Sequence, residues 1–563
     1  MMREGSFIVL TEIRCSVFED CGEARGPIVF NPGLNVILGS SHGSNSIGKS
    51  TFLLIIDFAF GGKTYAKNKE TLQNVGPHTI DFAFEFGGMT YRFSRSPMDV
   101  EQVWRCDEGY GHVEAISLKE YCEWLSDSYG MSDLGGTFRS LASVFMRAYG
   151  KDNYNVIKPL QSMPKEREEH AVTRLLRLYG RYGTVDQVQK LLKEAEENKK
   201  AFNESMKRDY IAVARNKSEY RQNEKRLAEL KQRISELERL EHDNLSDLDP
   251  LVAEQVARLK GELSKARRAK TRVIGQLRAI EADAGIGPFK AAKNFKDLGE
   301  FFPGVSLAKL EEIERFHEQL NKALAEERKE QRTILESRLG PLDTRIEELE
   351  EEIKRAGSAS NLTKQVLNEF YSVSRERDKL REANDGFDRR ERLAARVKTL
   401  KGRKGTVIGS ALTSTQVEVN ARLKELNDYV CGEGKSTPAI SLAGANAYSF
   451  GIPNDSGTGS QTRAMVLFDI VVLEQTPLPV ICHDTVSLKQ VADEAMMKLI
   501  DLYRAAGKQV FIALDKAETY ADGEVPATVK DAVVLELSDG HELFGRSWAK
   551  KGSDGDEEHK KAN

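Results

Sequence analysis

The chain has 563 residues, of which 30% are charged and only 40% are hydrophobic. This balance indicates that part of the chain is solvated helix and not globular domain. The net charge of −4 gives no overall attraction to nucleic acid or membrane, so such a partner has to be met by local patches. Six scattered cysteines with no C-x-x-C pair argue against a disulfide scaffold, a zinc finger and a zinc-clasped hinge.

Targeting signals are the next feature that the sequence bears on. The first residues lack the basic-then-apolar pattern of a signal peptide, and no apolar run approaches the roughly 20 residues that a membrane span requires. We therefore expect a soluble, cytoplasmic protein without a membrane partner.

Three zones follow one another along the chain. Residues 1–164 mix β-branched and aromatic residues with glycine turns, as strands do, and this globular texture returns over residues 405–548. Between them, residues 165–404 are rich in Glu, Lys, Arg, Leu and Ala, which is typical of long helices. The tail, residues 549–563, is poor in apolar residues, so we expect it to be disordered.

The middle zone carries the seam of a coiled coil. Apolar residues spaced alternately by four and three, the a/d pattern of a left-handed coiled coil, occur at Leu335, Leu339, Leu342, Ile346, Leu349 and Ile353. The only stretch of this zone with aromatic, glycine and proline residues lies within residues 283–306. We place the apex turn there, between an ascending arm at residues 165–282 and a descending arm at residues 307–404.

Helix breakers predict a bend in both arms. A polar stretch ends at Pro250 on the ascending arm, and Gly340 and Pro341 interrupt the descending arm. The distal segments have matching lengths, so the two breaks are expected to lie opposite each other as an elbow. A compact helical bundle is the alternative, because breaks at residues 357–361 and at Gly386 would also allow the helices to fold back.

The strongest local motif is GSNSIGKST, which fits the P-loop pattern G-x-x-x-x-G-K-[ST]. It follows a strand-like run and leads into a helix-like run, which is the required setting. Backbone N–H groups and the helix N-terminus would bind phosphates, Lys49 would contact the β- and γ-phosphates, and Ser50 would bind Mg²⁺. The sequence thus predicts an ATP site at Gly43, Asn45, Gly48, Lys49, Ser50 and Thr51.

Two further elements complete a nucleotide site. A P-loop needs a second carboxylate near the magnesium ion, and Asp484 directly follows the apolar run 480–482. We therefore expect Ser50 and Asp484 to hold the metal. Ser456, Gly457 and Gly459 form a small-residue loop before a helix-like run, which predicts phosphate binding at the helix N-terminus; a plain turn with a helix cap is the alternative.

The order of P-loop, coiled-coil hairpin, small-residue loop and strand with aspartate resembles the SMC and RecN class of ABC-type ATPases. The stretches NSIGKSTFL, HDTVSLKQ and QVFIALDK are most similar to short-armed SMC-like subunits of prokaryotic anti-phage and anti-plasmid defence systems of the Lamassu type. The resemblance implies an α/β ABC-type ATPase head assembled from both chain ends, with a long antiparallel coiled-coil hairpin inserted. It also implies a homodimer with two ATP molecules between two heads, an effector nuclease and a small accessory subunit.

Two positions depart from the pattern of that class. Thr485 stands where the class has a glutamate that polarises the attacking water, so hydrolysis is expected to be slow or to use another group. Asp515 stands where the class often has a histidine that senses the γ-phosphate, which makes it a candidate switch or base beside Asp484. No glutamine loop is evident; Arg139 or Arg147 is the candidate to point at the site, and an arginine extending from a helix to solvent is the alternative.

Basic clusters carry the case for nucleic acid. Within sixteen positions that hold a single acid, eight basic side chains occur at Arg389, Arg390, Arg392, Arg396, Lys398, Lys401, Arg403 and Lys404. We expect this cluster to bind the backbone of double-stranded DNA without sequence preference. A second run, residues 265–272, lies nearer the apex, and its alternative is a solvated face paired with the opposite arm.

Together these features predict an ATPase whose ATP-driven head engagement clamps or senses DNA and controls partner subunits in defence. Two alternatives stay open at this point. One is a RecN-like DNA repair ATPase without an effector. The other is a nucleotide-gated scaffold with little hydrolysis that holds an effector inactive.

Overall fold

The computed structural model describes most of the chain, namely residues 9–39, 47–207, 211–245, 250–283, 307–356, 361–515, 517 and 524–546. The chain divides into two compact units, which we call the head, Met1–Glu196 with Arg396–Asn563, and the arm, Glu197–Ala395. The predicted boundaries after residues 164 and 404 therefore differ from those of the structure. The head keeps the beginning of the ascending helices and the last part of the descending ones.

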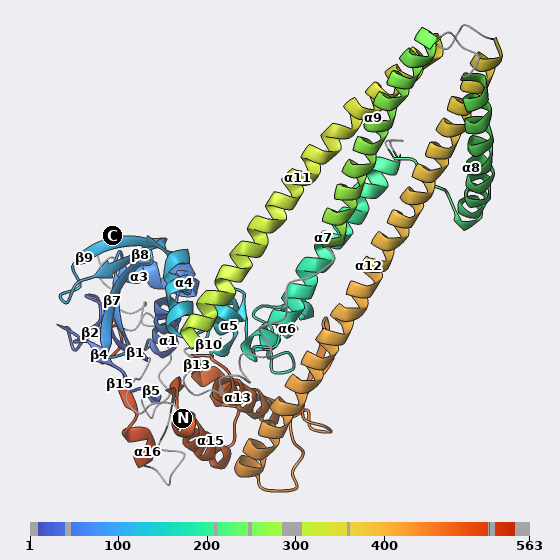
Figure 1. Cartoon of the computed structure of the whole chain (residues 1–563). Helices are drawn as coiled ribbons and strands as arrows, with labels where there is room; N and C mark the ends of the chain where they lie inside the picture. The colour runs from blue at the N-terminus through green and yellow to red at the C-terminus, as the bar shows by residue number, and fades with distance from the viewer. Residues whose placement is uncertain are drawn as a thin grey trace, which may run out of the picture. The chain divides into compact units, whose positions relative to one another are not determined.

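A five-stranded parallel sheet is built from both chain ends (Figure 1). Its order is β10 (Met146–Arg147), β13 (Val480–His483), β14 (Gln509–Leu514), β5 (Leu34–Gly39) and β15 (Val533–Leu537). Every residue of β5 and β14 is buried, which explains why these strands are continuous apolar runs without alternation. The sheet places the strand before the P-loop between two strands from the C-terminal part.

Helices contact this sheet and bury apolar side chains. They are α1 (Lys49–Ala59), α13 (Thr458–Gln475), α14 (Thr485–Leu488), α15 (Asp493–Ala505) and α16 (Ala527–Lys530). Helix α1 contacts β5 and β14, and α13 contacts β13. Both α1 and α13 are apolar on most of their surface, because little of either helix reaches solvent.

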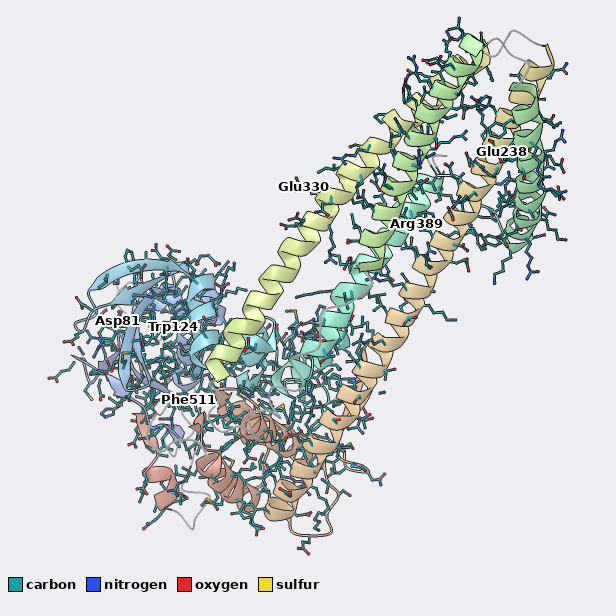
Figure 2. All side chains as sticks on the ribbon, in the orientation of Figure 1. Asp81, Trp124, Glu238, Glu330, Arg389 and Phe511 are labelled. Atoms are coloured by element: carbon teal, nitrogen blue, oxygen red, sulfur yellow. The ribbon has the colours of Figure 1, made fainter. Side chains whose placement is uncertain are left out.

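A six-stranded antiparallel sheet forms the second layer of the head. Its order is β4 (Ile28–Val29), β1 (Val9–Arg14), β6 (Ile80–Phe86), β7 (Met89–Ser96), β8 (Asp99–Cys106) and β9 (His112–Ser117). Helix α4 (Leu118–Ser128) packs on it through Trp124, whose ring centroid lies 4.7 Å from that of Phe93 (Figure 2). Alternation of apolar and polar residues in β6–β8 reflects this half-buried position.

Short elements complete the head. They are the hairpins β2 (Glu19–Asp20) with β3 (Glu23–Ala24) and β11 (Ala439–Gly444) with β12 (Ala447–Gly451), the helices α2 (Thr64–Lys67), α3 (Lys69–Val75), α5 (Phe138–Ala142) and α6 (Glu168–Leu178), and the 3₁₀ turns Ser132–Leu134 and Ser143–Phe145. Among the described helices of the whole chain, none combines the length and apolarity that crossing a membrane requires.

The buried amide of Gln509 joins the two chain ends. Its Oε1 accepts the N–H of Leu10 at 2.9 Å, and its Nε2 donates to the carbonyls of Leu10 and Asn31 at 2.7 and 3.0 Å. All three contacts are to main chain that lies some 500 residues away along the chain. One side chain thus connects the two sheets of the head.

Long helices make up the arm. They are α8 (Lys217–Leu245), α9 (Pro250–Asp283) and α11 (Leu307–Ala356), while α7 (Gly183–Lys207) and α12 (Asn361–Cys431) continue into it from the head. Helices α9 and α11 run antiparallel and in contact (Figure 1), with Lys270 bound to Asp343 at 2.8 Å and Arg345 to Glu262 at 3.3 Å. Helix α8 packs on α12 through Arg233, which binds Glu369 at 2.7 Å.

The predicted seam is the side of α11 that faces its neighbours. Leu335, Leu349 and Ile353 are buried, and the other seam positions are half-buried. A cluster of Val256, Leu259, Leu263, Leu349, Ile353 and Tyr371 joins α9, α11 and α12. Glu350 of α11 also binds Arg375 of α12 at 3.2 Å. Helices α9 and α11 therefore lie back along α12 within the arm.

The break predicted at Gly340 and Pro341 is wrong, because α11 is continuous through both residues. A proline inside a helix removes the donor to the carbonyl four residues earlier, that of Ser337. Ser337 is exposed, so water satisfies that carbonyl. Gly386 also lies inside α12, where an added Cβ would come within 2.3 Å of the carbonyl oxygen of Ala212.

Apart from Asp283, the predicted apex at residues 283–306 lies outside the described residues, as does the connection between α11 and α12. Within the descending arm the direction of the described helices changes between the end of α11 at Ala356 and the start of α12 at Asn361, and not at Gly340. Of the two breaks on which the alternative of folded-back helices rested, this agrees with the one at residues 357–361, whereas Gly386 lies inside α12.

Candidate functional site

The predicted P-loop joins the carboxyl end of β5 to α1, and of its residues the structure describes Ile47 and those that follow. Gly48 caps α1 with a φ of 105°, a left-handed conformation that favours glycine, and an added Cβ would lie 2.6 Å from the Cβ of Leu543. Gly39 is equally constrained, since its Cβ would lie 2.6 Å from the Lys49 ammonium. Of the predicted phosphate-binding residues, Gly43 and Asn45 lie outside the described residues.

Lys49 is the first residue of α1 and is almost completely buried. Its Nζ lies 2.6 Å from Oδ1 of Asp515, which directly follows β14. The other oxygen of Asp515 binds Lys489 at 2.9 Å. The predicted phosphate-binding lysine and the predicted switch carboxylate thus form an ion pair, and a phosphate has to compete with Asp515 for Lys49.

Asp484 follows β13 and is fully buried. Its Oδ2 accepts the backbone N–H of Tyr149 at 2.7 Å, whereas its Oδ1 is buried without a close hydrogen-bond donor. Burial raises the pKa of the Asp484 carboxyl, and the Tyr149 N–H, the Ser50 hydroxyl and the charge of Lys49 oppose this rise. Asp484 and Ser50 therefore lie together, although they are separated by more than 400 residues.

These groups fit a magnesium ion. Mg²⁺ prefers carboxylate and hydroxyl oxygens and usually takes only one or two from the protein, with the rest from water and phosphate. Oδ1 of Asp484 is a buried oxygen in need of a partner, and the Ser50 hydroxyl lies next to this carboxylate. Ser50 and Asp484 are the residues that would hold the ion.

Thr485 begins α14 directly after Asp484. Its hydroxyl is buried and donates to the carbonyl of Ala513 in β14 at 3.0 Å. The side chain therefore holds α14 against the sheet. It offers no group that can accept a proton near neutral pH.

The small-residue loop caps α13 on the surface of the head. Ser456 and Gly457 are exposed, and Gly457 is the N-cap residue without any side-chain cap. Asp455 accepts the N–H of Gly457 at 2.9 Å, which lowers the pKa of this carboxyl. An added Cβ on Gly459 would lie 2.3 Å from the carbonyl of Gln490, so the loop packs closely on the segment after α14.

The hydrogen bonds and ion pairs of this loop in the described structure are local, and none of them reaches the P-loop of the same chain. The helix N-terminus at Gly457 and Thr458 is open to a ligand that comes from outside. The loop is thus accessible to the phosphates of another molecule.

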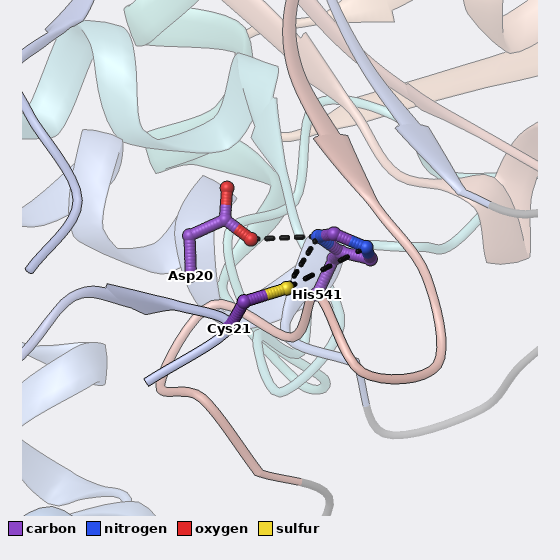
Figure 3. A group of neighbouring side chains, drawn as sticks. All are labelled: Asp20, Cys21 and His541. Carbon is purple, nitrogen blue, oxygen red and sulfur yellow. Dashed lines mark hydrogen bonds and ion pairs between the residues drawn. The ribbon is translucent and has the colours of Figure 1, made fainter. Parts of the chain in front are cut away.

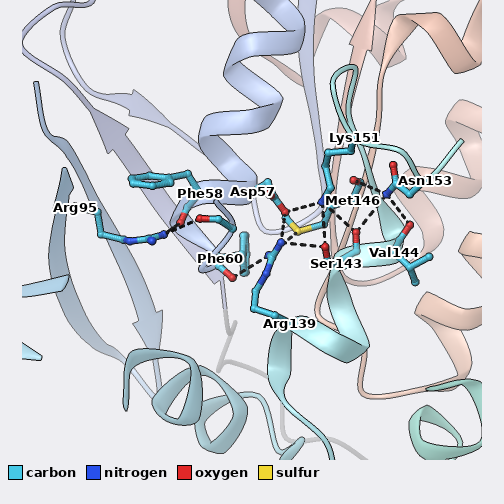
Figure 4. Close-up of polar contacts among 11 residues, drawn as sticks. Asp57, Phe58, Phe60, Arg95, Arg139, Ser143, Val144, Met146, Lys151 and Asn153 are labelled. Carbon is cyan, nitrogen blue, oxygen red and sulfur yellow. Dashed lines mark hydrogen bonds and ion pairs between the residues drawn. The ribbon is translucent and has the colours of Figure 1, made fainter. Parts of the chain in front are cut away.

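Arg139 does not point at the P-loop. It binds Asp57, in the second half of α1, at 2.7 Å and donates to the carbonyl of Phe60 at 3.0 Å (Figure 4). Lys151 binds the same Asp57 oxygen at 2.8 Å. Although burial opposes ionisation of Asp57, the charges of Arg139 and Lys151 hold its pKa below the ordinary value.

Arg147 is likewise held away from the P-loop. It lies on β10, is fully buried and binds both oxygens of Asp469 at 2.5 and 2.8 Å. Asp469 also accepts from His483 at 2.9 Å, and the other ring nitrogen of His483 lies 2.7 Å from the hydroxyl of Tyr503. Arg147 is therefore a core residue that connects α13 to the strand carrying Asp484. Neither arginine extends from a helix to solvent.

The eight basic residues of α12 differ in exposure. Arg392, Lys398, Lys401 and Arg403 are exposed, and Lys401 binds Glu196 at 2.8 Å. The other four are half-buried; Arg389 lies over the ring of Phe202 and Arg390 over that of Phe387. In the second basic run, residues 265–272, Arg267 and Lys270 pair with carboxylates of α11 and α12, as the solvated-face alternative predicts.

The solved structures that are similar to this chain include three Smc heads. The Smc head domain with a coiled coil and joint from Pyrococcus yayanosii has 16% identity and a TM-score of 0.41, covering 93% of this chain and 99% of that one. The Smc head domain with an extended coiled coil from Pyrococcus furiosus, bound to the C-terminal domain of ScpA, has 12% identity and a TM-score of 0.32, covering 92% of each chain. A Smc head bound to the C-winged helix domain of ScpA has 8% identity and a TM-score of 0.33, covering 90% of each.

A family model described as an uncharacterised protein conserved in bacteria (DUF2326) matches residues 432–548. No curated protein matches the chain. The matched segment contains the small-residue loop, Asp484 and Asp515. The assignment of function therefore rests on this chain's own residues.

Two buried acids were missed by sequence reasoning. Asp57 interrupts the apolar run of α1, and Asp469 interrupts that of α13. A carboxylate inside an apolar helix needs a buried partner, so these runs do contain a signal that could have found the ion pairs. Their partners are not adjacent in sequence, and only the fold reveals them.

Proposed function

We propose that this chain is an SMC-like ATPase of the ABC type that binds ATP and magnesium at the carboxyl edge of its parallel sheet. The observation that carries the proposal is the convergence of Lys49, Ser50, Asp484 and Asp515 from opposite ends of the chain. A P-loop pattern alone occurs by chance. The pattern does not require a buried carboxylate beside Ser50, so the position of Asp484 is independent support for the site.

Each residue has a role in binding. The N-terminus of α1 receives the phosphates, and Gly48 allows the backbone to approach them. Lys49 leaves Asp515 and contacts the phosphates. Ser50 and Asp484 hold the magnesium ion, whose charge offsets that of the phosphates during transfer to water.

When Lys49 moves to the phosphates, Asp515 loses one of its two ion pairs. While Lys49 and Lys489 bind both of its oxygens, Asp515 is a poor proton acceptor. Once Lys49 turns to the phosphate, Asp515 keeps one lysine and exposes one oxygen at the end of β14. This supports Asp515 as the sensor of the γ-phosphate or as the base, with slow turnover because Thr485 cannot act as one.

Two heads are proposed to join through ATP. The loop of Ser456, Gly457 and Gly459 makes no contact with its own P-loop among the described residues and opens to solvent. In a homodimer it would face the phosphates bound to the second head. Head engagement would then place α12 residues on double-stranded DNA and signal to an effector nuclease and a small accessory subunit of an anti-phage or anti-plasmid system.

The test is ATP binding by isothermal calorimetry. Lys49→Ala should abolish binding while the far-ultraviolet circular dichroism stays that of the wild type. Lys119→Ala, which removes an exposed lysine of α4, is the matched control and should bind normally. Unchanged affinity in Lys49→Ala would refute the site.

Dimerisation is measured on the same proteins by light scattering with and without ATP. The mass of the wild type should double with ATP. Gly457→Asp should stay monomeric, because it adds a negative charge beside the γ-phosphate. An equal mass with and without ATP would refute ATP-driven dimerisation but would not contradict the proposed ATP site.

DNA binding is proposed for the cluster of eight basic residues of α12. Each phosphate contact should contribute about −0.9 to the slope of log affinity against log salt. Replacing Arg392, Arg396, Lys398 and Lys401 by glutamate should flatten that slope for every DNA sequence and leave ATP affinity unchanged. DNA binding equal to that of the wild type at low and high salt would leave these residues a solvated helix face.

One observation favours the nucleotide-gated scaffold as a second candidate. Thr485 stands at the water-activating position, and its hydroxyl already donates to the carbonyl of Ala513. In a scaffold, ATP would hold the dimer without sustained turnover. Multiple turnovers per head in a phosphate-release assay separate the ATPase from the scaffold.

A further inference from the structure

A cluster of three potential metal ligands lies outside the nucleotide site. Asp20 and Cys21 belong to the β2–β3 hairpin, and His541 lies in the C-terminal segment after β15 (Figure 3). Their ligand atoms all lie within 4.8 Å of one another. We propose that Asp20, Cys21 and His541 bind a zinc-class transition metal ion, which acts as a clip between the β2–β3 hairpin and the segment after β15.

The distances suit a shared ion. Sγ of Cys21 lies 3.4 Å from Nδ1 of His541. A tetrahedral zinc ion with its ordinary bond lengths separates a sulfur and a nitrogen ligand by about 3.5 Å. Oδ1 of Asp20 lies 2.7 Å from the same nitrogen, a hydrogen bond that a small opening of the carboxylate would turn into coordination.

The arrangement does not suit a cysteine nucleophile. In a Cys-His-Asp triad the thiol and the carboxylate bind opposite nitrogens of the ring. Here the carboxylate binds Nδ1, and Sγ lies at similar distances from both ring nitrogens, 3.4 and 3.7 Å, so the thiol is not aligned with Nε2 as a triad requires. The three ligand atoms lie within 4.8 Å of one another, and a rotation of the imidazole lets them share one ion.

The backbone at Cys21 gives a second, independent observation. Cys21 and Gly22 are the two central residues of the hairpin, with φ of 52° and 84°. Such turns favour asparagine or glycine at the first position, and a cysteine there is in a strained left-handed conformation. Strain of this kind clusters at functional sites, and here it points the thiol at His541.

The surroundings hold the ligands in place. Arg25 lies 3.5 Å from the other oxygen of Asp20 and donates to the carbonyl of His541. Phe18 and Phe544 pack beside the ligands with ring centroids 5.7 Å apart, and the N–H of Glu19 donates to the carbonyl of Leu543. Hydrogen bonds to the ligating groups orient them and strengthen binding.

The chemistry selects the ion. A thiolate and an imidazole are ligands that favour Zn²⁺ over Mg²⁺ or Ca²⁺, and a carboxylate is also an ordinary zinc ligand. Three protein ligands leave a fourth position for water. The site is partly exposed, so an ion can enter from solvent.

The test is metal binding by the full chain, reduced and freed of metal by chelation, without nucleotide. Zinc is titrated against a chromophoric chelator, and Co²⁺ is used to detect thiolate coordination as charge-transfer absorption in the near ultraviolet. The wild type should bind one Zn²⁺ and show this absorption. Cys21→Ser, Asp20→Asn and His541→Ala should weaken binding by at least about tenfold, and Cys21→Ser should lose the absorption.

Cys106→Ser is the matched control, since it removes a half-buried thiol of the same head at the β8–β9 edge and should bind as the wild type does. Equal zinc affinity in Cys21→Ser and the wild type would overturn the proposal and leave a simple carboxylate–imidazole pair. An equal loss of zinc affinity in Cys106→Ser would also overturn the proposal, because it would indicate that zinc binds to scattered thiols. Because no nucleotide is present, neither result depends on the ATP site.

The melting temperature gives a second test of the proposed metal clip. Zinc should raise the melting temperature of the wild type, because an ion that binds only the folded chain stabilises it. It should leave that of Cys21→Ser unchanged. A rise of the same size in both proteins would place the zinc elsewhere.

Discussion

In the head, charged side chains such as Asp469 and Arg147 are completely buried and bind each other, whereas many ion pairs of the arm, such as that of Arg226 with Glu376, join side chains that are close to half-exposed; the buried Glu350 is an exception. The head also has one large apolar core that spans both chain ends, while the arm cluster has six buried residues. A buried pair leaves an uncompensated charge when one partner is lost, and an exposed pair is resolvated by water. The head is therefore sensitive to single polar changes that the arm tolerates.

The largest expected effect comes from Asp469→Ala. Loss of the carboxylate leaves the buried guanidinium of Arg147 without its ionic partner and removes the partner of His483. The free energy of unfolding of the head should therefore fall by about 3–5 kcal/mol. Urea unfolding followed by tryptophan fluorescence measures it. A fall below about 1 kcal/mol would erase the distinction between the two units.

A smaller effect is expected from Thr485→Val, which keeps the shape and removes the donor to the carbonyl of Ala513. The buried carbonyl then lacks a partner, which should cost about 1–3 kcal/mol. ATP turnover should stay the same, while Thr485→Glu should raise it. A drop in turnover for the valine variant, at equal ATP affinity, would assign the hydroxyl a catalytic role.

The smallest effect is expected from Glu376→Gln in the arm. Glu376 binds Arg226 at 2.8 Å, but both side chains are well exposed and Arg226 keeps Glu229 as a second partner. The loss should be about 0.2–1 kcal/mol and should vanish at high salt. Circular dichroism melts at two salt concentrations measure this. A salt-independent loss of several kcal/mol would mean that the arm depends on buried charge as the head does.

The parts of the site that could be predicted from sequence are those encoded locally. Gly48, Lys49 and Ser50 are adjacent in the chain, and Asp484 ends an apolar strand, so spacing alone indicated them. The pairing of Lys49 with Asp515 and the burial of Arg147 depend on which strands become neighbours, which no local pattern encodes. Asp20 and His541 were missed for the same reason, since about 520 residues separate them.

The arm shows the opposite limit. Its heptad spacing correctly identified the side of α11 that packs, because a seam is a property of one helix. The position of the bend was wrong, because proline was treated as a breaker without regard to solvent. At Pro341 the carbonyl that loses its donor belongs to an exposed turn, so the helix continues.

The junction made by Gln509 has a consequence for biosynthesis. Strand β5 is completely buried and apolar except for Asn35, yet its neighbour β14 emerges from the ribosome roughly 470 residues later. At about 5–20 residues per second, translation leaves this strand without its neighbour for roughly half a minute to a minute and a half. During that time the nascent N-terminal segment exposes an unpaired apolar strand, while the arm helices can form as they are made. The order of synthesis thus makes the proposed nucleotide site the last part of the molecule to be assembled, and we expect a chaperone that shields apolar strands to raise the yield of folded protein.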